Sequence, residues 1–282
     1  MAVFGFLKSI DLATNRRLKF GIHNFLNSRF ITYPLTQGLL EPPFDTVFAP
    51  PAELAERLQK GELDMAFIPS IEYARMENLS IVPGFGIASM GEVKSVVVFS
   101  RYELDTIENI AVDSRSRTSV ALLKILLKEY YKRDVNFIVA EQDASNIPEN
   151  ADAALLIGDE TFDLNATDYN LFDLSKTWHE FTGKPFVFAL LCVAEGIDAD
   201  YAVAALERAK AISLEKIDEI IRSGALELEI SEDVCRDYLT NCLRYDLNNE
   251  DIVGLKMFFQ LAVKNGIAEK EPALNYYARF RS

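Results

Sequence analysis

Short apolar segments alternate with segments of helical periodicity through the first two-thirds of this chain, and that alternation is what most restricts its fold. Residues 18–22 and 63–68 have the apolar pattern of strands, whereas residues 52–60 have helical spacing after Pro50 and Pro51. A strand, a polar turn and a helix in that order form the βα unit of a parallel sheet, in which ligands bind beyond the carboxyl ends of the strands. The sequence therefore predicts an α/β fold with its site on that edge.

Two long apolar segments divide these elements into two groups. Residues 93–100 and 186–191 are nearly continuous apolar runs, so we expect both to be buried strands that cross between lobes. The first lobe is predicted to comprise residues 1–100 and 187–282, and the second residues 101–186, with a hinge and a cleft between them. Further strands are expected at residues 110–112, 135–139 and 153–157, and helices at residues 119–131, 201–212, 214–222, 231–245 and 249–265.

The balance of charges restricts the partners. The 282 residues include 29 lysines and arginines and 43 aspartates and glutamates, which give a formal net charge of −14. Nucleic acids and anionic membranes require a basic surface, so neither is an expected partner, whereas a small anion needs only a few local donors. Residues 1–7 are apolar but too short for a signal peptide, and no apolar stretch approaches the about 18 residues that span a bilayer. We therefore expect a cytoplasmic protein.

The cysteines indicate neither a disulfide framework nor a metal site. There are three, Cys192, Cys235 and Cys242, and no C-x-x-C pair occurs among them. Buried free thiols are the expected state. Nothing in the sequence indicates an organic cofactor, so the expected cofactor set is empty.

Hydroxyl side chains gather where a predicted strand passes into a helix. Ser116, Thr118 and Ser119 follow the strand at residues 110–112 and open the helix at residues 119–131. The first N–H groups of a helix have no partner within it, and together with the helix dipole they favour an anion. Because Ser and Thr are also common N-caps, these residues alone predict either a helix cap or an anion site.

Several strings, taken in order, resemble one enzyme family. They are FLNS at residues 25–28, GELD at 61–64, IPSIEY at 68–73, GEVKSV at 91–96, DSRSRTS at 113–119, LIGD at 156–159 and WHEFTGKPFVF at 178–188. Over about residues 19–268 the chain resembles the chorismate dehydratases of the futalosine route to menaquinone. The resemblance implies the two-lobed type 2 fold of periplasmic binding proteins and a reaction without cofactor or metal that dehydrates chorismate to 3-[(1-carboxyvinyl)oxy]benzoate. We expect chorismate as the small-molecule partner of a monomer or homodimer.

The resemblance also implies roles for individual residues. Asn27 and Ser95 are the expected catalytic residues, because an amide and a hydroxyl can orient a substrate and donate to a departing oxygen. Each has a structural alternative, since an asparagine can close a turn and a serine can donate to a neighbouring carbonyl. The expected substrate-binding residues, for which capping and turn formation are the alternatives, are Ser70, Ser116, Thr118, Ser119 and Asp159.

No side chain in the sequence is a secure general base. His23 lies near Asn27 but outside the matching string, and His179 lies at the far end of the second lobe. Glu72 is close to the predicted cleft without a clear role. The sequence therefore favours a mechanism in which the enolpyruvyl carboxylate of the substrate accepts the proton from ring carbon C3.

Two departures from the family and three other functions accompany this hypothesis. Where the family has a proline soon after the asparagine, this chain has residues 29–33 before Pro34, and residues 1–17 precede the first strand.

The related 1,4-dihydroxy-6-naphthoate synthase of the same route should have a catalytic histidine in the second lobe. A non-catalytic small-anion binding protein should carry an export signal, and a transcriptional effector domain should carry a DNA-binding helix-turn-helix.

Overall fold

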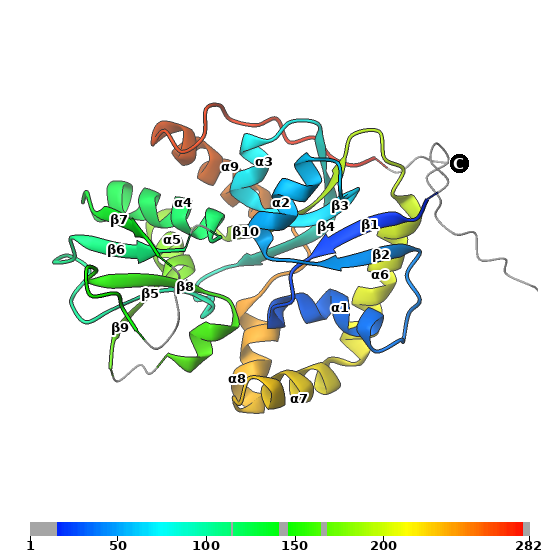
Figure 1. The fold of residues 1–282 in the computed structure, drawn as a ribbon, viewed down its shortest axis with the longest axis horizontal. Coiled ribbons are helices and arrows are strands. Elements are labelled where there is room, and N and C mark those ends of the chain that lie inside the picture. Colours follow the sequence, from blue (N-terminus) through cyan, green and yellow to red (C-terminus); the bar gives the residue numbers. More distant parts are fainter. Residues whose placement is uncertain (1–15, 114, 141–145, 165–167, 279–282) are drawn as a thin grey trace, which may run out of the picture.

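Two five-stranded sheets, each covered by helices, make up the computed structural model (Figure 1). The structure describes residues 16–113, 115–140, 146–164 and 168–278. In Figure 1 the sheets lie side by side, with the smaller lobe, drawn mostly in green, beside the larger one. The expected α/β fold with two lobes is confirmed, while the expectation about a signal peptide at residues 1–7 lies outside the described residues.

The sheet of the first lobe has the strand order β2-β1-β3-β10-β4. β1 (Leu18–Ile22) is parallel to β2 (Phe44–Phe48) and β3 (Met65–Pro69), whereas β10 (Phe186–Ala194) runs antiparallel between β3 and β4 (Leu79–Ser89). The carboxyl ends of the three parallel strands therefore meet at one edge. The residues that follow or end them line the cleft described below.

Helices pack around this first sheet, and their local sequences explain where they begin. α2 starts with a proline at its first position, and α9 starts with a capping box in which Asn248 and Asp251 each accept a backbone N–H of the other. The helical elements are η1 (Leu26–Ser28), α1 (Arg29–Thr36), α2 (Pro51–Gln59), α3 (Ser70–Arg75), α6 (Asp200–Glu215), α7 (Ile217–Glu227), α8 (Glu232–Asp237), the π-helical turn η4 (Tyr238–Cys242) and α9 (Asn249–Lys264).

The sheet of the second lobe repeats the arrangement of the first. Its order is β7-β6-β8-β5-β9, with β6 (Asn109–Val112) parallel to β7 (Asn136–Val139) and β8 (Ala153–Ile157). β5 (Val96–Ser100) runs antiparallel between β8 and β9 (Asn170–Asp173). In each lobe an antiparallel strand thus follows three parallel ones. The helical elements are α4 (Arg117–Ile125), the π-helical turn η2 (Leu126–Tyr130), η3 (Asp159–Asp163) and α5 (Leu174–Thr182).

The strand expected at residues 93–100 is shorter than predicted and belongs to the other sheet. Lys94 has a φ of +65°, a left-handed conformation that delays the strand until after Ser95. Asp173 Oδ2 holds this bend by accepting the N–H of Val93 at 2.9 Å and that of Lys94 at 2.6 Å. The chain therefore passes between the sheets before β5, which moves β5 out of the predicted first lobe and into the second.

Other differences from the predicted elements have local causes. β4 contains a proline and two glycines, and α1 contains Pro34, residues that disfavour the interior of a strand or a helix. Both elements were missed, along with β2, β9 and α5. The helix expected at residues 119–131 is α4 followed by η2, and the one expected at 231–245 is α8 followed by η4. The remaining predicted strands and helices are present within a few residues of their expected bounds.

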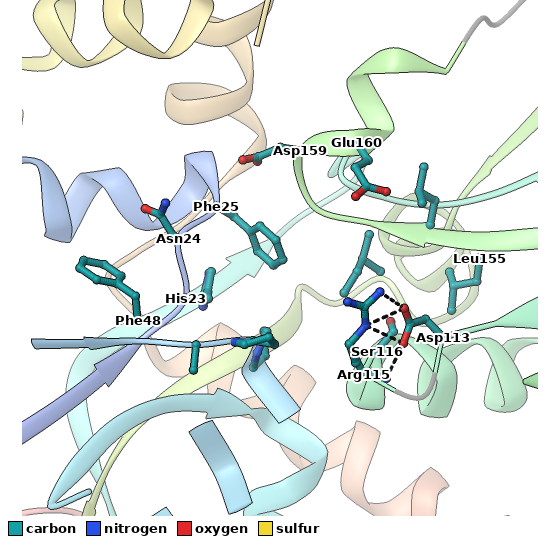
Figure 2. A pocket seen from close by; sticks show the side chains of 15 residues that line it. His23, Asn24, Phe25, Phe48, Asp113, Arg115, Ser116, Leu155, Asp159 and Glu160 are labelled. Carbon is teal, nitrogen blue, oxygen red and sulfur yellow. Dashed lines mark hydrogen bonds and ion pairs between the residues drawn. The ribbon is translucent and has the colours of Figure 1, made fainter. Parts of the chain in front are cut away.

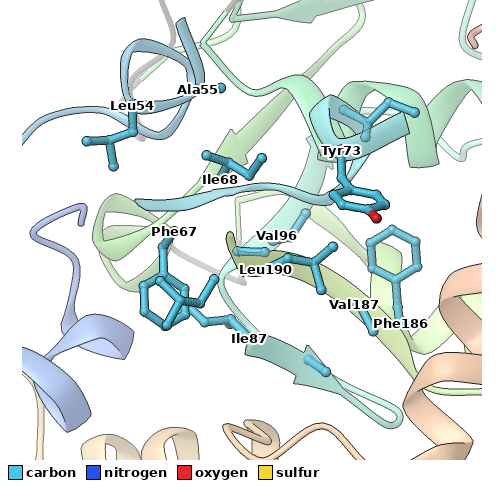
Figure 3. Close-up of a cluster of buried hydrophobic side chains, with 14 of the residues drawn as sticks. Leu54, Ala55, Phe67, Ile68, Tyr73, Ile87, Val96, Phe186, Val187 and Leu190 are labelled. Carbon is cyan, nitrogen blue, oxygen red and sulfur yellow. The ribbon is translucent and has the colours of Figure 1, made fainter. Parts of the chain in front are cut away.

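A hydrophobic core shared by both lobes holds the cleft walls in place. Figure 3 shows Phe67 and Ile68 of β3 packed near Leu190 of β10. Phe186 and Val187, at the start of β10, are at most 1% exposed and continue this core towards the second lobe. Burial of each such side chain contributes about 1.5–3 kcal/mol to the free energy of folding relative to full exposure. The strand ends that carry the site are therefore held by a well-packed core.

Two smaller expectations concern the thiols and the membrane. Cys192, Cys235 and Cys242 are free and buried, as expected. Among the described residues, no helix has both the length and the apolar character needed to cross a bilayer.

Candidate active site

A cleft with two adjoining chambers separates the lobes at the carboxyl ends of β1, β2 and β3. The outer chamber has a volume of about 460 Å³, which is within the usual range for small-molecule sites, and the inner chamber has about 80 Å³. Figure 2 shows His23 and Phe25 on the first-lobe side of the outer chamber and Arg115 and Ser116 on the other. The residues that line both chambers are His23, Phe25, Pro51, Arg115, Ser116 and Ile157.

The N-terminus of α4 forms part of the inner chamber. Ser116 is the N-cap residue by position, yet its hydroxyl makes no cap bond and is buried without a hydrogen-bond partner in the described part of the chain. Thr118 and Ser119 also line the chamber, and Thr118 Oγ1 accepts the N–H of Ile71 from the first lobe at 3.3 Å. The first N–H groups of α4 have no partner within the helix. This end of α4 is therefore suited to an anion.

Four buried side chains form a continuous hydrogen-bond chain on the first-lobe side of the inner chamber. His23 Nε2 lies 2.7 Å from Asn27 Oδ1, which can only accept, so Nε2 carries the hydrogen. Asn27 Nδ2 donates to the Tyr238 hydroxyl at 3.3 Å, and that hydroxyl donates to Ser95 Oγ at 2.9 Å. The two residues predicted to be catalytic, Asn27 and Ser95, are thus linked through Tyr238.

The two ionisable side chains in this row of hydrogen bonds, His23 and Tyr238, are neutral near pH 7. Burial lowers the pKa of His23 to about 4, although its bond to Asn27 acts in the opposite direction. Burial raises the pKa of Tyr238 far above its usual value, and the bond to Ser95 offsets only part of that change. The chain is therefore a set of neutral dipoles, with no charge that could repel an anionic ligand.

Asp159 lines the outer chamber, but its carboxylate accepts a hydrogen bond from the protein backbone. Both of its oxygens accept the backbone N–H of Leu26, at 2.9 and 3.0 Å, across the gap between the lobes. Burial raises the pKa of Asp159 to about 6, because the hydrogen bond to Leu26 and the charge of Arg29 only partly compensate for the loss of water. Asp159 therefore joins the lobes beside Asn27.

The outer chamber also has a charged rim. Arg115, whose side chain is 59% exposed, donates from Nε to Asp113 Oδ2 at 2.8 Å. Burial alone would raise the pKa of Asp113, but the bonds from Arg115 hold it below its usual value. Asp159 and Glu160, which also belong to the second lobe, line the same chamber above Arg115 in Figure 2. The second-lobe side of the outer chamber thus carries a cation, Arg115, that is paired with Asp113 and lies near two further carboxylates.

Ser70 is not brought to the cleft, which corrects its predicted place. It is fully buried, its hydroxyl donates to the carbonyl of Val187 at 2.7 Å, and it does not line either chamber. Ser70 thus joins α3 to β10. Glu72 and His179, to which the sequence gave no clear role, do not line either chamber. Glu72 forms ion pairs with Arg75 and Arg117, and His179 lies on α5.

Two residues of the site were missed or undervalued in the sequence. Tyr238 comes from a helical segment far along the chain, and its contact with Ser95 spans 143 residues, so no local pattern could reveal it. His23 was set aside because it lay outside the matching string. Its position directly after a predicted strand that ends at the binding edge was the signal that could have found it.

The fold and the interlobe cleft define a class, the two-lobed proteins with the periplasmic-binding-protein fold. A solved structure of the protein AF1704 from Archaeoglobus fulgidus superposes with a TM-score of 0.73 at 20% identity, covering 89% of this chain and 98% of that one. The periplasmic aliphatic sulphonate binding protein SsuA from Escherichia coli gives a TM-score of 0.62 at 14% identity, covering 94% and 93%. These likenesses confirm the predicted fold.

Sequence comparison then identifies the family. The chain belongs to the menaquinone biosynthesis family, whose sequence model matches residues 18–264. A relative from Thermus thermophilus, named chorismate dehydratase, is 30% identical in an alignment of 249 residues that covers 80% of this chain and 89% of the relative. The resemblance stated from the sequence is therefore confirmed.

Proposed function

We propose that this protein is a hydro-lyase that converts chorismate into 3-[(1-carboxyvinyl)oxy]benzoate and water on the futalosine route to menaquinone. The observation that carries the proposal is that Asn27 and Ser95 share one small chamber with the anion-binding N-terminus of α4. The 30% identity to the chorismate dehydratase of Thermus thermophilus supports the reaction. The family match to menaquinone biosynthesis supports the pathway.

The reaction removes a hydrogen from ring carbon C3 and the hydroxyl from C4. The electron pair of the C3–H bond becomes the new C3–C4 π bond, and the C4–O bond breaks with its electrons on oxygen. The departing hydroxide takes up the proton that was removed from C3 and leaves as water. Aromatisation of the ring favours the product. Because the barrier lies in losing a carbon-bound proton and a poor leaving group, the site must orient the substrate and stabilise the departing oxygen.

Ser95 and Asn27 act on the reacting part of the substrate in this proposal. The Ser95 hydroxyl donates to the departing C4 oxygen, and the second hydrogen of the Asn27 amide orients the enolpyruvyl carboxylate, which accepts the C3 proton. His23 is not the base in this proposal, because its Nε2 carries a hydrogen that it already donates to Asn27. The substrate therefore supplies the base.

The N-terminus of α4 binds a carboxylate of the substrate. The unpartnered hydroxyl of Ser116 and the N–H groups of Thr118 and Ser119 supply donors, and the helix dipole favours the negative charge. Arg115 adds a positive charge at the mouth of the cleft. These local donors allow a protein with a net charge of −14 to bind a dianion, because screening limits the range of the overall field.

The test is to incubate the purified protein with chorismate, without metal or nucleotide, and to follow the aromatic product by chromatography and mass spectrometry. We expect product with the wild type and strongly reduced product with Asn27→Ala and Ser95→Ala. Ser213→Ala is the matched control, since Ser213 is fully buried in α6 and does not line either chamber. Unchanged chorismate with folded wild-type protein contradicts the proposal and favours a non-catalytic binder of small anions.

The remaining partners and the compartment are also proposals. The acidic surface supports a small-molecule partner and no nucleic acid or membrane. We propose a cytoplasmic monomer or homodimer in which residues 1–100 with 187–282, apart from β5, form one lobe, and β5 with residues 101–186 forms the other.

A further inference from the structure

The geometry points to Tyr238 as a positioning residue that aims the Ser95 hydroxyl at the substrate through a one-way hydrogen-bond chain from His23. The inference rests on the proposed dehydration of chorismate and deepens it. It assigns a role to a residue that lies outside every string on which the family resemblance was based. It also fixes Ser95 as a donor in the reaction.

The Asn27 amide fixes the direction of the first two hydrogen bonds, and the third, from Tyr238 to Ser95, completes the inferred order. The Asn27 amide oxygen can only accept and the amide nitrogen can only donate, so the hydrogens run from His23 to Asn27 and from Asn27 to Tyr238. Tyr238 has one hydrogen, and it is given to Ser95 Oγ at 2.9 Å. Each member thus donates to the next, and none is charged near pH 7.

This direction determines what Ser95 can offer to a ligand. Its oxygen already accepts the Tyr238 hydrogen, so the hydrogen of Ser95 is left to donate into the inner chamber, which Ser95 lines. Neutral hydrogen bonds in a chain polarise one another, so the donation from Tyr238 strengthens Ser95 as a donor. A donor at this position is what a departing hydroxyl needs.

Tyr238 is placed where three parts of the molecule meet. It begins η4, a π-helical turn that joins α8 to the rest of the C-terminal segment, and such turns occur often at functional sites. Its ring packs edge-on against Phe162 of the second lobe, with centroids 5.1 Å apart. Its hydroxyl reaches Asn27 in the first lobe and Ser95 in the connection between the lobes. The π-helical turn thus holds a single hydroxyl against both predicted catalytic residues.

The backbone around Ser95 is fixed independently of Tyr238. Asp173 accepts the N–H groups of Val93 and Lys94, and the carbonyl of Ser95 accepts the N–H of Gly158 at 2.9 Å. Loss of the Tyr238 hydroxyl should therefore leave Ser95 in place and change only the direction of its hydroxyl. That separates a positioning role from a structural one.

The experiment compares four proteins with chorismate as substrate: wild type, Tyr238→Phe, Ser95→Ala and the double variant. We expect Tyr238→Phe to lower kcat about 10-fold, with KM and the Kd for the aromatic product within about 3-fold of wild type. In the Ser95→Ala background the same change should alter kcat by less than about 2-fold, because the hydroxyl that Tyr238 orients is already absent and the bond from Asn27, at 3.3 Å, is the longer of the two contacts of Tyr238.

Tyr245→Phe is the matched control. The Tyr245 hydroxyl is equally buried but has no hydrogen-bond partner in the described ranges, and its ring stacks on Phe30 with centroids 4.3 Å apart. We expect an unchanged kcat for this variant. Independent, multiplying effects of Tyr238→Phe and Ser95→Ala overturn the inference, and so does a Tyr238→Phe variant that unfolds or loses product binding, since the hydroxyl then serves the fold.

The two proposals fail in different ways. Wild-type protein that leaves chorismate unchanged overturns the dehydratase function itself. Wild-type turnover that persists unaltered in Tyr238→Phe overturns only the role of Tyr238.

Discussion

The carboxylate of Asp159 in the second lobe accepts the backbone N–H of Leu26 in the first, at 2.9 Å from Oδ1 and 3.0 Å from Oδ2. Leu26 is the first residue of η1, the turn that carries Asn27. The bond therefore fixes the segment of a predicted catalytic residue from across the cleft. Asp159, which the sequence predicted to bind substrate, instead holds the η1 turn of the first lobe. Substitutions of Asp159 should therefore change the stability of the protein as well as its activity.

Asp159→Asn should stabilise the protein at neutral pH. The pKa of Asp159 is about 6 in the folded protein against an ordinary 3.8, so its protonated form favours the folded state. That contribution is full below about pH 4 and is lost as the pH rises through 6. Because an asparagine stays neutral and still accepts the Leu26 N–H, we expect a gain of about 1–2 kcal/mol at pH 7.5, discounted for partial exposure.

Thermal unfolding at two pH values measures this effect. The gain in Tm of Asp159→Asn over wild type should be about 2–6 °C at pH 7.5 and should disappear near pH 4. An equal difference at both pH values would show that the charge of Asp159 is not the cause.

His23 should produce the opposite dependence on pH. Burial lowers its pKa to about 4 from 6.5, so the unfolded chain binds the proton first as the pH falls. The stability contributed by neutral His23 is full above pH 6.5 and is lost as the pH falls towards 4. Over that window the wild type should lose about 3 kcal/mol relative to His23→Gln, measured by urea unfolding. A constant difference in unfolding free energy would contradict the burial of a neutral histidine here.

The same residue should affect turnover through Asn27. Gln retains an N–H that can donate to Asn27 Oδ1, whereas Leu leaves that oxygen without its donor. We expect His23→Leu to lower kcat about 10-fold and His23→Gln to stay within about 3-fold of wild type. Equal losses in the two variants would assign His23 a different role, such as direct contact with the substrate.

The predictions from sequence succeeded where the signal was local. The strand at residues 18–22, the helix start after Pro50 and the hydroxyls at the start of α4 all follow from short patterns, and the structure has them in place. Ser70 was misplaced because a serine after a strand reads the same whether it faces the cleft or donates to β10. Tyr238 was missed because its role depends on packing between elements, which no periodicity records.

Gly158 should be intolerant of a side chain. Its φ of +80° and ψ of −153° lie in a region almost restricted to glycine, and an added Cβ would lie 3.0 Å from the Phe25 ring. Gly158→Ala should cost about 2–4 kcal/mol and displace Phe25, which lines both chambers, so KM should rise. Gly183→Ala is the control: its φ is +67°, but no described atom lies within 4 Å of the added Cβ, so it should cost about 1 kcal/mol with normal KM. Similar KM values for both variants would show that Phe25 does not shape the substrate site.

Ser116 and Ser213 offer the sharpest comparison, because each buries a hydroxyl without a partner in the described part of the chain. An unsatisfied buried hydroxyl costs free energy, so both Ser116→Ala and Ser213→Ala should leave the unbound protein as stable as wild type or slightly more stable. Only Ser116 lines the cleft, at the N-terminus of α4. Because a hydrogen bond to a charged group contributes about 1.5–3 kcal/mol, Ser116→Ala should raise KM for chorismate about 10- to 100-fold, whereas Ser213→Ala should leave it unchanged. Steady-state kinetics and unfolding of the two variants make the measurement. A normal KM for Ser116→Ala would mean that its hydroxyl does not bind the carboxylate and that the backbone N–H groups of α4 bind it alone.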